Sequence, residues 1–511
     1  MLVKTYGSAV HGIDATTITI ETDISRGIRF NLVGLPDSAV KESQQRIDAA
    51  LRFIDLKLPG KKIVINMAPA DIRKEGSAYD LPIAIGILAA SEQMLAPELS
   101  KYMMMGELSL DGGLQPVKGV LSIAVRAREE GFEGFIVPKQ NAREAAVVDK
   151  LKIFGAESLK EVIDFLSGRV GIEQTIIDTR EEFKARISNY DLDFTDVKGQ
   201  ENVKRALEIA AAGGHNLIMI GPPGAGKTML AKRIPTILPP FTLKEALETT
   251  KIHSVAGKID RETSLMTLRP FRSPHHTISD VALVGGGTYP QPGEISMAHN
   301  GVLFLDELPE FKRTVLEVLR QPLEDRMITI SRAKFSVEYP ASFMLVASMN
   351  PCPCGFYNHP TKQCVCGPGM VQKYLSRISG PLLDRIDIHL EVVPVPFNEL
   401  TDLKPGEKSE IVRQRVSRSR EIQRERFHDT EIYCNAQMTT KMLNKYCIPD
   451  LAGHQLLKNA MEKLGLSARA YDRILKVSRT IADLEGSESI QADHLGEAIQ
   501  YRSLDREGWG A

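Results

Sequence analysis

Residues 221–228 read Gly221-Pro222-Pro223-Gly224-Ala225-Gly226-Lys227-Thr228, and they decide the fold of the second half of this chain. An apolar run at 216–220 precedes this loop, and a helical pattern begins directly after it. The glycines let backbone N–H groups turn inward around phosphate groups, and the helix N-terminus adds positive charge. Lys227 is predicted to contact the β- and γ-phosphates and Thr228 to hold Mg²⁺. A plain Gly-Pro turn would not need the full pattern, so we expect an ATP site.

A second apolar run, residues 301–305, ends in Asp306 and Glu307. We predict that Asp306 orients Mg²⁺ and that Glu307 polarises the attacking water as general base. Acids at a strand end are often only solvated, but the nearby phosphate-binding loop favours the catalytic interpretation. A third strand ends at Asn350, which is placed to hydrogen-bond the γ-phosphate or that water, although asparagine also commonly caps a turn.

The 511 residues are too many for one ordinary core, and the pattern along the chain divides them. Residues 1–170 alternate short β-rich runs with helical ones and predict an α/β domain. Residues 171–195 are polar and are expected to be a linker. Residues 196–398 carry the phosphate-binding loop and predict a parallel sheet with helices, and residues 399–511 predict a helical lid domain.

Charge and hydropathy restrict the partners and the location. Lys plus Arg number 64 and Asp plus Glu 65, so any contact with nucleic acid must be local. The longest apolar stretch, residues 81–90, is too short to cross a bilayer, and the N-terminus lacks the apolar core of a signal peptide. We expect a cytoplasmic protein without a membrane partner.

Four of the six cysteines lie within fifteen residues of one another. Four thiolates suit tetrahedral zinc, with unliganded reduced thiols as the alternative, and His359 is a further candidate ligand. Cys434 and Cys447 lack partners at ligand spacing and are expected to be packing residues. The candidate zinc ligands are Cys352, Cys354, Cys364 and Cys366.

Further motifs resemble the AAA+ superfamily of ATPases. Residues 196–201, which include Val197, look like the adenine-side segment of that superfamily, and Asn350 looks like its first sensor. Residues 382–387 resemble the arginine-finger segment, which implies that Arg385 reaches the γ-phosphate of a neighbouring subunit in a ring. Arg469 resembles the second sensor, which implies a place over the phosphates of its own subunit. A surface salt bridge is the alternative for either arginine.

The segment 269–279 is similar to the magnesium-chelatase-like branch of AAA+ proteins. The resemblance implies an insertion in the second helix of the core and a hairpin before the first sensor. That hairpin is expected over Met327–Tyr339, with Arg332, Ala333 and Lys334 at its turn. His275 and His276 fit hydrogen-bonded loop residues better than metal ligands.

Residues 106–121 and 135–139 resemble the proteolytic domain of Lon protease, whose mechanism needs a serine activated by a lysine. In an ungapped alignment the serine position falls on Ala78 and the lysine position on Leu121. A shifted pair of Ser77 and Lys118 is an alternative, but a nucleophile needs accurate placement. We therefore expect a platform or binding surface without protease activity.

A Lon-like domain followed by a chelatase-like AAA+ module resembles the YifB/ComM family. Membership implies a homo-hexameric ring that translocates on DNA and promotes branch migration in recombination and natural transformation. The alternatives are the ATPase motor subunit of a metal chelatase and a protein-remodelling complex. No small-molecule substrate other than ATP is expected.

A ring of neutral chains can still build a positive channel from a few residues of each subunit. An arginine-rich stretch, 413–426, is interleaved with glutamates and is expected to be a solvated or intersubunit helix. The candidate DNA contacts are Arg332, Lys334, Arg269, Arg272 and Lys258.

Overall fold

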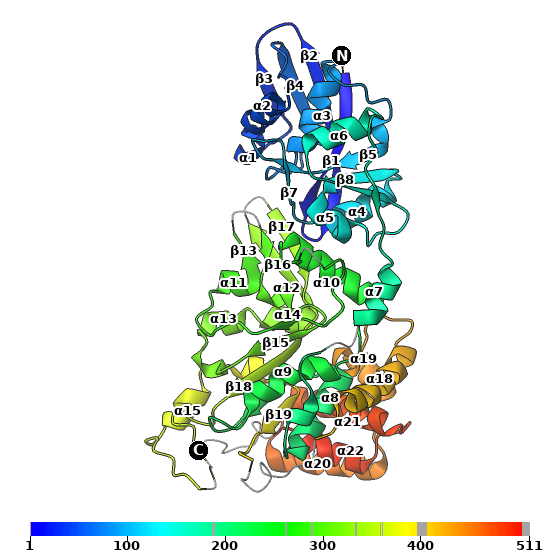
Figure 1. Cartoon of the computed structure of the whole chain (residues 1–511). Helices are drawn as coiled ribbons and strands as arrows, with labels where there is room; N and C mark the ends of the chain where they lie inside the picture. The colour runs from blue at the N-terminus through cyan, green and yellow to red at the C-terminus, as the bar shows by residue number, and fades with distance from the viewer. Residues whose placement is uncertain are drawn as a thin grey trace. The chain divides into compact units, whose positions relative to one another are not determined.

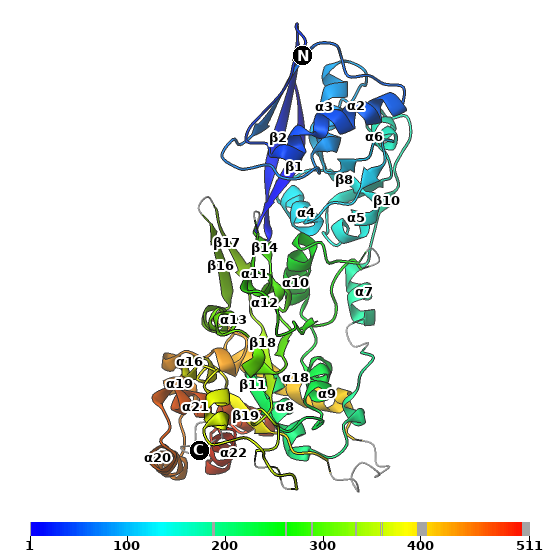
Figure 2. The same cartoon turned by 90° about the vertical axis from the view of Figure 1, so that its left-hand side faces the viewer.

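The computed structural model describes residues 2–186, 190–260, 263–287, 290–332, 335–357, 359, 361–395 and 406–502 (Figures 1 and 2). The chain forms two compact units. The first unit consists of residues 1–185 and 243–267, and the second consists of residues 186–242 and 268–511.

An eight-stranded mixed sheet is the frame of the first unit, in the order β10-β9-β8-β5-β1-β2-β4-β3. Its longest strands are antiparallel neighbours whose inward-facing residues, such as Ile18 and Ile20, are fully buried. The strands are β1 (Leu2–His11), β2 (Asp14–Ser25), β3 (Phe30–Val33), β4 (Lys62–Ala68), β5 (Tyr102–Met104), β8 (Gly134–Pro138), β9 (Lys152–Ala156) and β10 (Gln174–Thr175), with a separate pair, β6 (Glu107–Leu108) and β7 (Leu114–Gln115).

Helix α3 (Asp80–Ala90) is the centre of the first unit's core. All of its residues are buried, and it packs against β1 and β2. An apolar stretch that is hydrophobic on every face is therefore an interior helix. Among the described residues, no helix is long and apolar enough to cross a membrane. The other helices in this part are α1 (Ser38–Lys41), α2 (Ser43–Phe53), α4 (Val120–Glu129), α5 (Lys139–Ala145) and α6 (Leu159–Leu166).

The stretch expected to be a linker is partly regular structure. β10 pairs with β9, and α7 (Thr179–Arg186) and a 3₁₀ turn (Phe194–Asp196) follow. Helix α10 (Leu243–Val255) was expected within the nucleotide-binding core, but it packs on α4 in the first unit. The N–H of Gly119 donates to the carbonyl of Ser254 over 3.2 Å, and the hydroxyl of Ser254 donates to the carboxylate of Glu144.

A five-stranded parallel sheet, in the order β12-β15-β18-β11-β19, is the frame of the second unit and confirms the predicted α/β core. Its central strands are buried on both faces, as their continuous apolar sequence requires. The elements are β11 (Leu217–Ile220), β12 (Phe271–Arg272), β15 (Val302–Leu305), β18 (Met344–Met349) and β19 (Ile388–Glu391), with α8 (Glu201–Gly213) before β11 and α9 (Lys227–Ile237) after it.

The predicted hairpin is confirmed: β16 (Met327–Arg332) pairs antiparallel with β17 (Phe335–Pro340) (Figure 2). Ala333 and Lys334, and the side chain of Arg332, lie outside the described residues. The shorter elements of this unit are α11 (Asp280–Val284), β13 (Gly285–Gly286), β14 (Gln291–Pro292), α12 (Glu294–Met297), α13 (Arg313–Glu317), α14 (Arg320–Asp325), α15 (Met370–Leu375) and α16 (Gly380–Leu383).

The C-terminal part is helical, as predicted. Ser467 caps α21 by accepting from the N–H of Ala470, and Gly486 ends it in the left-handed conformation. The arginine-rich helix α18 packs on α8, α9 and α21, and Arg415 and Arg426 bind Glu208 and Asp483 within the same subunit. One face of α18 is therefore buried within the subunit, while the other face, with Arg418 and Arg424, is exposed, as expected of a solvated helix. A contact of this face with a neighbouring subunit stays a prediction. The helices are α18 (Ser409–Arg426), α19 (Thr440–Tyr446), α20 (Leu451–Leu464), α21 (Ala468–Glu485) and α22 (Ala492–Gln500).

Candidate nucleotide site

The carboxyl ends of three neighbouring strands bring the predicted site residues together. Gly221 follows β11, Asp306 follows β15 and Asn350 follows β18, and β18 pairs with both of the other strands. In a parallel sheet these ends lie at one edge, where ligands of open α/β sheets bind.

Two glycines of the phosphate-binding loop, residues 221–228, have backbone conformations that side chains rarely allow. Gly224 and Gly226 have φ values of +80° and +88°. A methyl group on Gly221 would lie 2.1 Å from the carbonyl oxygen of Val392, so only glycine fits there. The loop therefore presents its backbone N–H groups directly before α9.

The ammonium group of Lys227 points back into this loop. It donates to the carbonyls of Gly221 and Pro222 over 2.7 and 3.0 Å, and to Oδ1 of Asn350 over 3.1 Å. Burial lowers the pKa of Lys227, while the charges of Asp306 and Glu307 oppose that change. Phosphate oxygens would replace these weak acceptors with charged ones.

Thr228 and Asp306 form a hydroxyl–carboxylate pair. The Thr228 hydroxyl donates to Oδ2 of Asp306 over 2.7 Å, and the hydroxyl of Ser348 donates to Oδ1. Hard oxygen donors of this kind fit Mg²⁺ bound together with phosphates. Sequence reasoning missed Ser348, although its position two residues before Asn350 on the same strand was a usable signal.

Glu307 has an unusual backbone and a histidine neighbour. Its φ is +53°, a left-handed conformation that favours glycine. Oε2 of its carboxylate lies 3.7 Å from Nδ1 of His276, whose ring stacks at 4.1 Å on that of His275. His276, which was expected to be a loop residue, therefore lies beside the predicted general base.

The adenine-side segment is tied to the phosphate-binding loop. Val197 is buried in the second unit's core. The side-chain amide of Gln200 donates to the carbonyl of Ala225 over 3.1 Å and to that of Val393 over 3.0 Å. These bonds fix the segment beside the strand β19 that borders the loop.

Arg385 and Arg469 lie at the amino ends of the parallel strands, whereas the phosphate-binding loop lies at their carboxyl ends. The segment 384–387 precedes β19, and the N–H of Asp387 donates to the carbonyl of Asn216, just before β11 begins. Because β19 and β11 are parallel, one strand length, about 13 Å at ~3.3 Å per residue, separates this end from Gly221. Arg469 donates to Asp384 over 2.9 Å.

This placement corrects the expectation that Arg469 lies over the phosphates of its own subunit. Its side chain is 64% exposed and is paired with the residue next to Arg385. Arg385 is buried and donates to the carboxylate of Glu324 and the carbonyl of Pro381. It would have to leave Glu324 before it reached any phosphate.

Two further contacts of Asp387 tie the same end of β19 to helix α21 and to the residue before Asn216. Asp387 is fully buried and pairs with Arg473 over 3.1 Å and with Nδ1 of His215 over 3.2 Å. Burial opposes ionisation of Asp387, but Arg473 and the hydrogen bond from His215 hold its pKa below the ordinary value. Sequence reasoning missed this network because its members are far apart in the chain.

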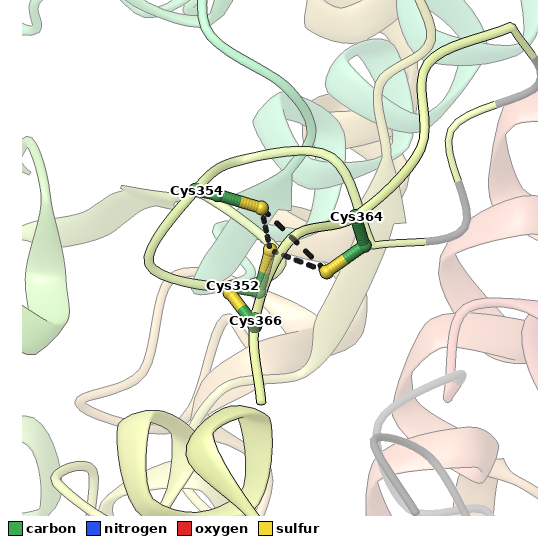
Figure 3. Close-up of side chains that lie close together, drawn as sticks. All are labelled: Cys352, Cys354, Cys364 and Cys366. Atoms are coloured by element: carbon green, nitrogen blue, oxygen red, sulfur yellow. Dashed lines mark hydrogen bonds between the residues drawn. The ribbon is translucent and has the colours of Figure 1, made fainter. Parts of the chain in front are cut away.

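The four predicted zinc ligands converge in space (Figure 3). Their sulfur atoms all lie within 4.8 Å of one another, with separations of 3.3 Å for Cys352 and Cys354 and 3.5 Å for Cys354 and Cys364. Four free thiols from C-x-C pairs fit tetrahedral zinc. His359 is not a member of the cluster, since its Nδ1 accepts from the N–H groups of Thr361 and Lys362. Cys434 and Cys447 are buried, as expected.

The Lon-like positions in the first unit carry no serine–lysine pair. Leu121 is fully buried on α4, and Ala78 stands where the serine is expected. The Ser77 hydroxyl donates to Glu107, and the side chain of Lys118 packs along Gly257. The shifted pair is therefore wrong as well, because each member has a different partner.

Two candidate DNA contacts are occupied within the subunit. Arg272 forms a bidentate pair with Glu294 at 2.6 and 2.7 Å. Arg269 donates to the carbonyls of Pro239 and Asn300 and stacks on Phe241. These two side chains would have to give up these bonds to contact DNA, whereas Lys258 is an exposed residue of the first unit.

A parallel sheet in this order, with a phosphate-binding loop, an acidic strand end and a sensor-like asparagine, defines an AAA+ protein. Comparison with known proteins agrees. The family described as magnesium chelatase, subunit ChlI, matches residues 193–400, its C-terminal family matches 406–502, and a subunit ChlI family of Mg-chelatase matches 20–141.

Full-length relatives define the family more closely. The chain is 46% identical to competence protein ComM of Haemophilus influenzae, over 99% of this chain and 98% of that protein. It is 45% identical to YifB of Escherichia coli, over 98% and 96%. Lon protease 2 of Bacillus subtilis is 32% identical over 28% of this chain and 27% of its own length. The chain belongs to the YifB/ComM family of magnesium-chelatase-like AAA+ ATPases.

Proposed function

We propose that this protein is an ATP-hydrolysing ring motor that acts on DNA and promotes branch migration during recombination and natural transformation. One observation supports a ring. The phosphate-binding loop lies at the carboxyl ends of the parallel strands, and the two candidate arginines lie at the amino ends. A site with both sets of groups needs two subunits, and a head-to-tail contact of this kind closes into a ring.

The hydrolytic roles follow from the contacts. Lys227 neutralises charge on the β- and γ-phosphates, and Asn350, its hydrogen-bond partner, positions the γ-phosphate or the attacking water. Thr228 and Asp306 would hold Mg²⁺, which supplies charge neutralisation at the phosphates when bound. Glu307 accepts the proton of the attacking water. Arg385, after release from Glu324, and the exposed Arg469 act on the nucleotide of the neighbouring subunit.

The DNA role rests on the family and on the hairpin. A relative with nearly the whole chain in common is named a competence protein. The β16–β17 hairpin carries basic residues at its turn, and a ring repeats them in every subunit, so a chain with a net charge of −1 still builds a positive channel.

The decisive experiment measures ATP turnover of the purified ring with and without forked or four-way DNA. We expect stimulation of about tenfold that falls with rising salt, because phosphate contacts release counterions. No response to DNA, with stimulation by a protein client or by chelatase partner subunits instead, would replace the proposal with one of the two alternatives.

Neutralising the hairpin sharpens the assignment. Arg332→Ala with Lys334→Ala should reduce DNA-stimulated turnover while basal turnover stays unchanged. Lys458→Ala, which removes an exposed charge on α20, is the matched control. Equal stimulation in all three proteins would reject the hairpin as the DNA contact.

We further propose that Cys352, Cys354, Cys364 and Cys366 hold one structural Zn²⁺, which closes the loop they stand on. Elemental analysis of protein purified without chelators should give one zinc per chain. A metal-free preparation of fully folded protein would defeat this assignment. The free thiols fit a reducing cytoplasm, where we place the protein.

The remaining regions receive supporting roles. We propose that residues 1–170 form a Lon-like platform that binds rather than cleaves, and that residues 196–398 and 399–511 act as motor core and lid. The absence of a serine–lysine pair at Ala78 and Leu121 supports the platform role.

A further inference from the structure

The loop that carries the four cysteines, described at residues 351–357, 359 and 361–366, touches the phosphate-binding loop. We name it the cysteine loop. Gly355 on this loop is buried and has a φ of +83°. A methyl group added to Gly355 would lie 2.6 Å from Cδ of Pro223, a contact that real side chains do not make. The backbone of the cysteine loop therefore packs directly on the ring of Pro223.

A small hollow lies between the same two segments. Its volume is about 70 Å³, and the phosphate-binding loop contributes Gly221 and Pro222 to its lining. The cysteine loop contributes Pro351, Tyr357 and His359, and the ends of β11 and β19 complete the lining. The cysteine loop is thus a neighbour of the first residues of the phosphate-binding loop at more than one point.

The shape of the cysteine loop depends on Cys352. The N–H of Gly355 donates to the carbonyl of Cys352 over 3.0 Å, and the N–H of Tyr357 donates to its sulfur over 3.3 Å. Cys352 is fully buried, and its sulfur lies 3.8 Å from that of Cys364 at the far end of the loop. A change at the four thiols therefore alters the turn on which Gly355 sits.

We infer that the cysteine loop is one wall of the nucleotide site, and that the state of its four thiols sets how tightly the phosphate-binding loop holds an adenine nucleotide. The inference rests on the proposed nucleotide site and is independent of DNA. Gly355 is the contact point, and Pro223 transmits its position because a proline ring cannot move without its backbone.

The first test compares two glycines with the same backbone strain. Gly355→Ala should weaken binding of a fluorescent ADP analogue by about tenfold, because overpacking displaces the phosphate-binding loop. Gly369→Ala is the matched control: Gly369 has a φ of +74°, but nothing lies within 4 Å of its added methyl group. Its affinity should change by less than about twofold.

A second variant keeps this test falsifiable if the Gly355 protein is unstable. Pro223→Ala removes the ring atoms that the new methyl group would meet, so the Gly355→Ala, Pro223→Ala double variant should recover most of the lost affinity. Equal affinities for the two glycine variants, or no recovery in the double variant, would contradict the inference that the cysteine loop is a wall of the nucleotide site.

The thiol state is tested on the full chain by Zn²⁺ and a chelator. Affinity for the ADP analogue should fall about fivefold when the metal is removed and return when Zn²⁺ is restored. Loss of zinc with unchanged affinity would overturn the link to the thiols. A wild-type protein that binds no nucleotide at all would instead contradict the proposed function.

Discussion

The two units of this chain differ in the reactive side chains that their sheets position. In the first unit, the positions where Lon would place its serine and lysine carry Ala78, which is half-buried, and Leu121, which is fully buried. In the second unit, Lys227, Asp306 and Asn350 share hydrogen bonds at one edge of the sheet with their neighbours. Burial of apolar side chains is enough to keep a fold, whereas catalysis needs each reacting side chain at its correct position.

The largest expected effect is the loss of ATP turnover when the proposed general base of the second unit is changed. Glu307→Gln should lower ATP turnover at least about 100-fold while nucleotide binding persists, because the amide cannot accept the proton of the attacking water. Phosphate release and binding of a fluorescent ATP analogue measure the two steps. Residual turnover above one tenth of the wild-type rate would assign the base to another residue.

Mixing two inactive variants tests whether the second unit's site is shared. Lys227→Ala and Arg385→Ala should each be nearly inactive, but a 1:1 mixture should regain about a quarter of the activity, since that fraction of random interfaces contains both intact groups. A mixture of Lys227→Ala with Glu307→Gln is the control, and it should regain nothing because both residues belong to the same subunit's site. No recovery in the first mixture would contradict the shared site.

His276 offers a smaller perturbation at the same edge. His276→Ala should lower turnover about fivefold with an unchanged KM for ATP, because the carboxylate of Glu307 loses the neighbour that orients it. His276→Asn places a side-chain amide near the position of Nδ1 and should retain most of the rate. Equal losses in both variants, or a change in KM alone, would argue for a structural role.

Two buried aspartates, one in each unit, should respond to acid in opposite directions. Burial raises the pKa of Asp80 to about 6 despite its pairing with Arg46, whereas the pKa of Asp387 is held low. Between pH 7 and 5 the folded state protonates Asp80 before the unfolded state does, so this group raises the free energy of unfolding by about 1 kcal/mol. Asp387 loses its contribution only below about pH 4.

Hydrogen exchange of α3 and α21 at pH 7 and 5, corrected for intrinsic rates, follows each unit separately. Asp80→Asn should remove the gain in α3 at pH 5 and leave α21 as in the wild type. A gain in α3 that persists in this variant would show that another group titrates.

The smallest expected effect belongs to the first unit. Ser77→Ala should leave ATP turnover within about twofold of the wild type, and neither protein should hydrolyse peptides, because the Ser77 hydroxyl is bound to Glu107 and not to a lysine. Serine-dependent peptide hydrolysis by the wild type would contradict the expectation that the first unit has no protease activity.

Local patterns predicted much of this molecule. The phosphate-binding loop and the cysteine cluster depend on residues close in sequence, so their spacing identified them. The hairpin was implied by the resemblance to chelatase-like proteins, and its alternating sequence agreed. The side of the sheet on which Arg469 lies depends on the direction of β19 relative to β11, which the sequence does not state. Distant partners also decide the places of α10 and α18, since Ser254 binds Glu144 and Arg415 binds Glu208, each more than 100 residues away.

Helix α10 has a consequence for how the gene can be divided. The chain enters the first unit, leaves it at residue 185, returns for residues 243–267 and leaves again. Neither unit is therefore encoded by one uninterrupted stretch. Any fragment from the N-terminus that is long enough to complete the first unit also contains residues 221–228, so a clean deletion of either unit damages the other.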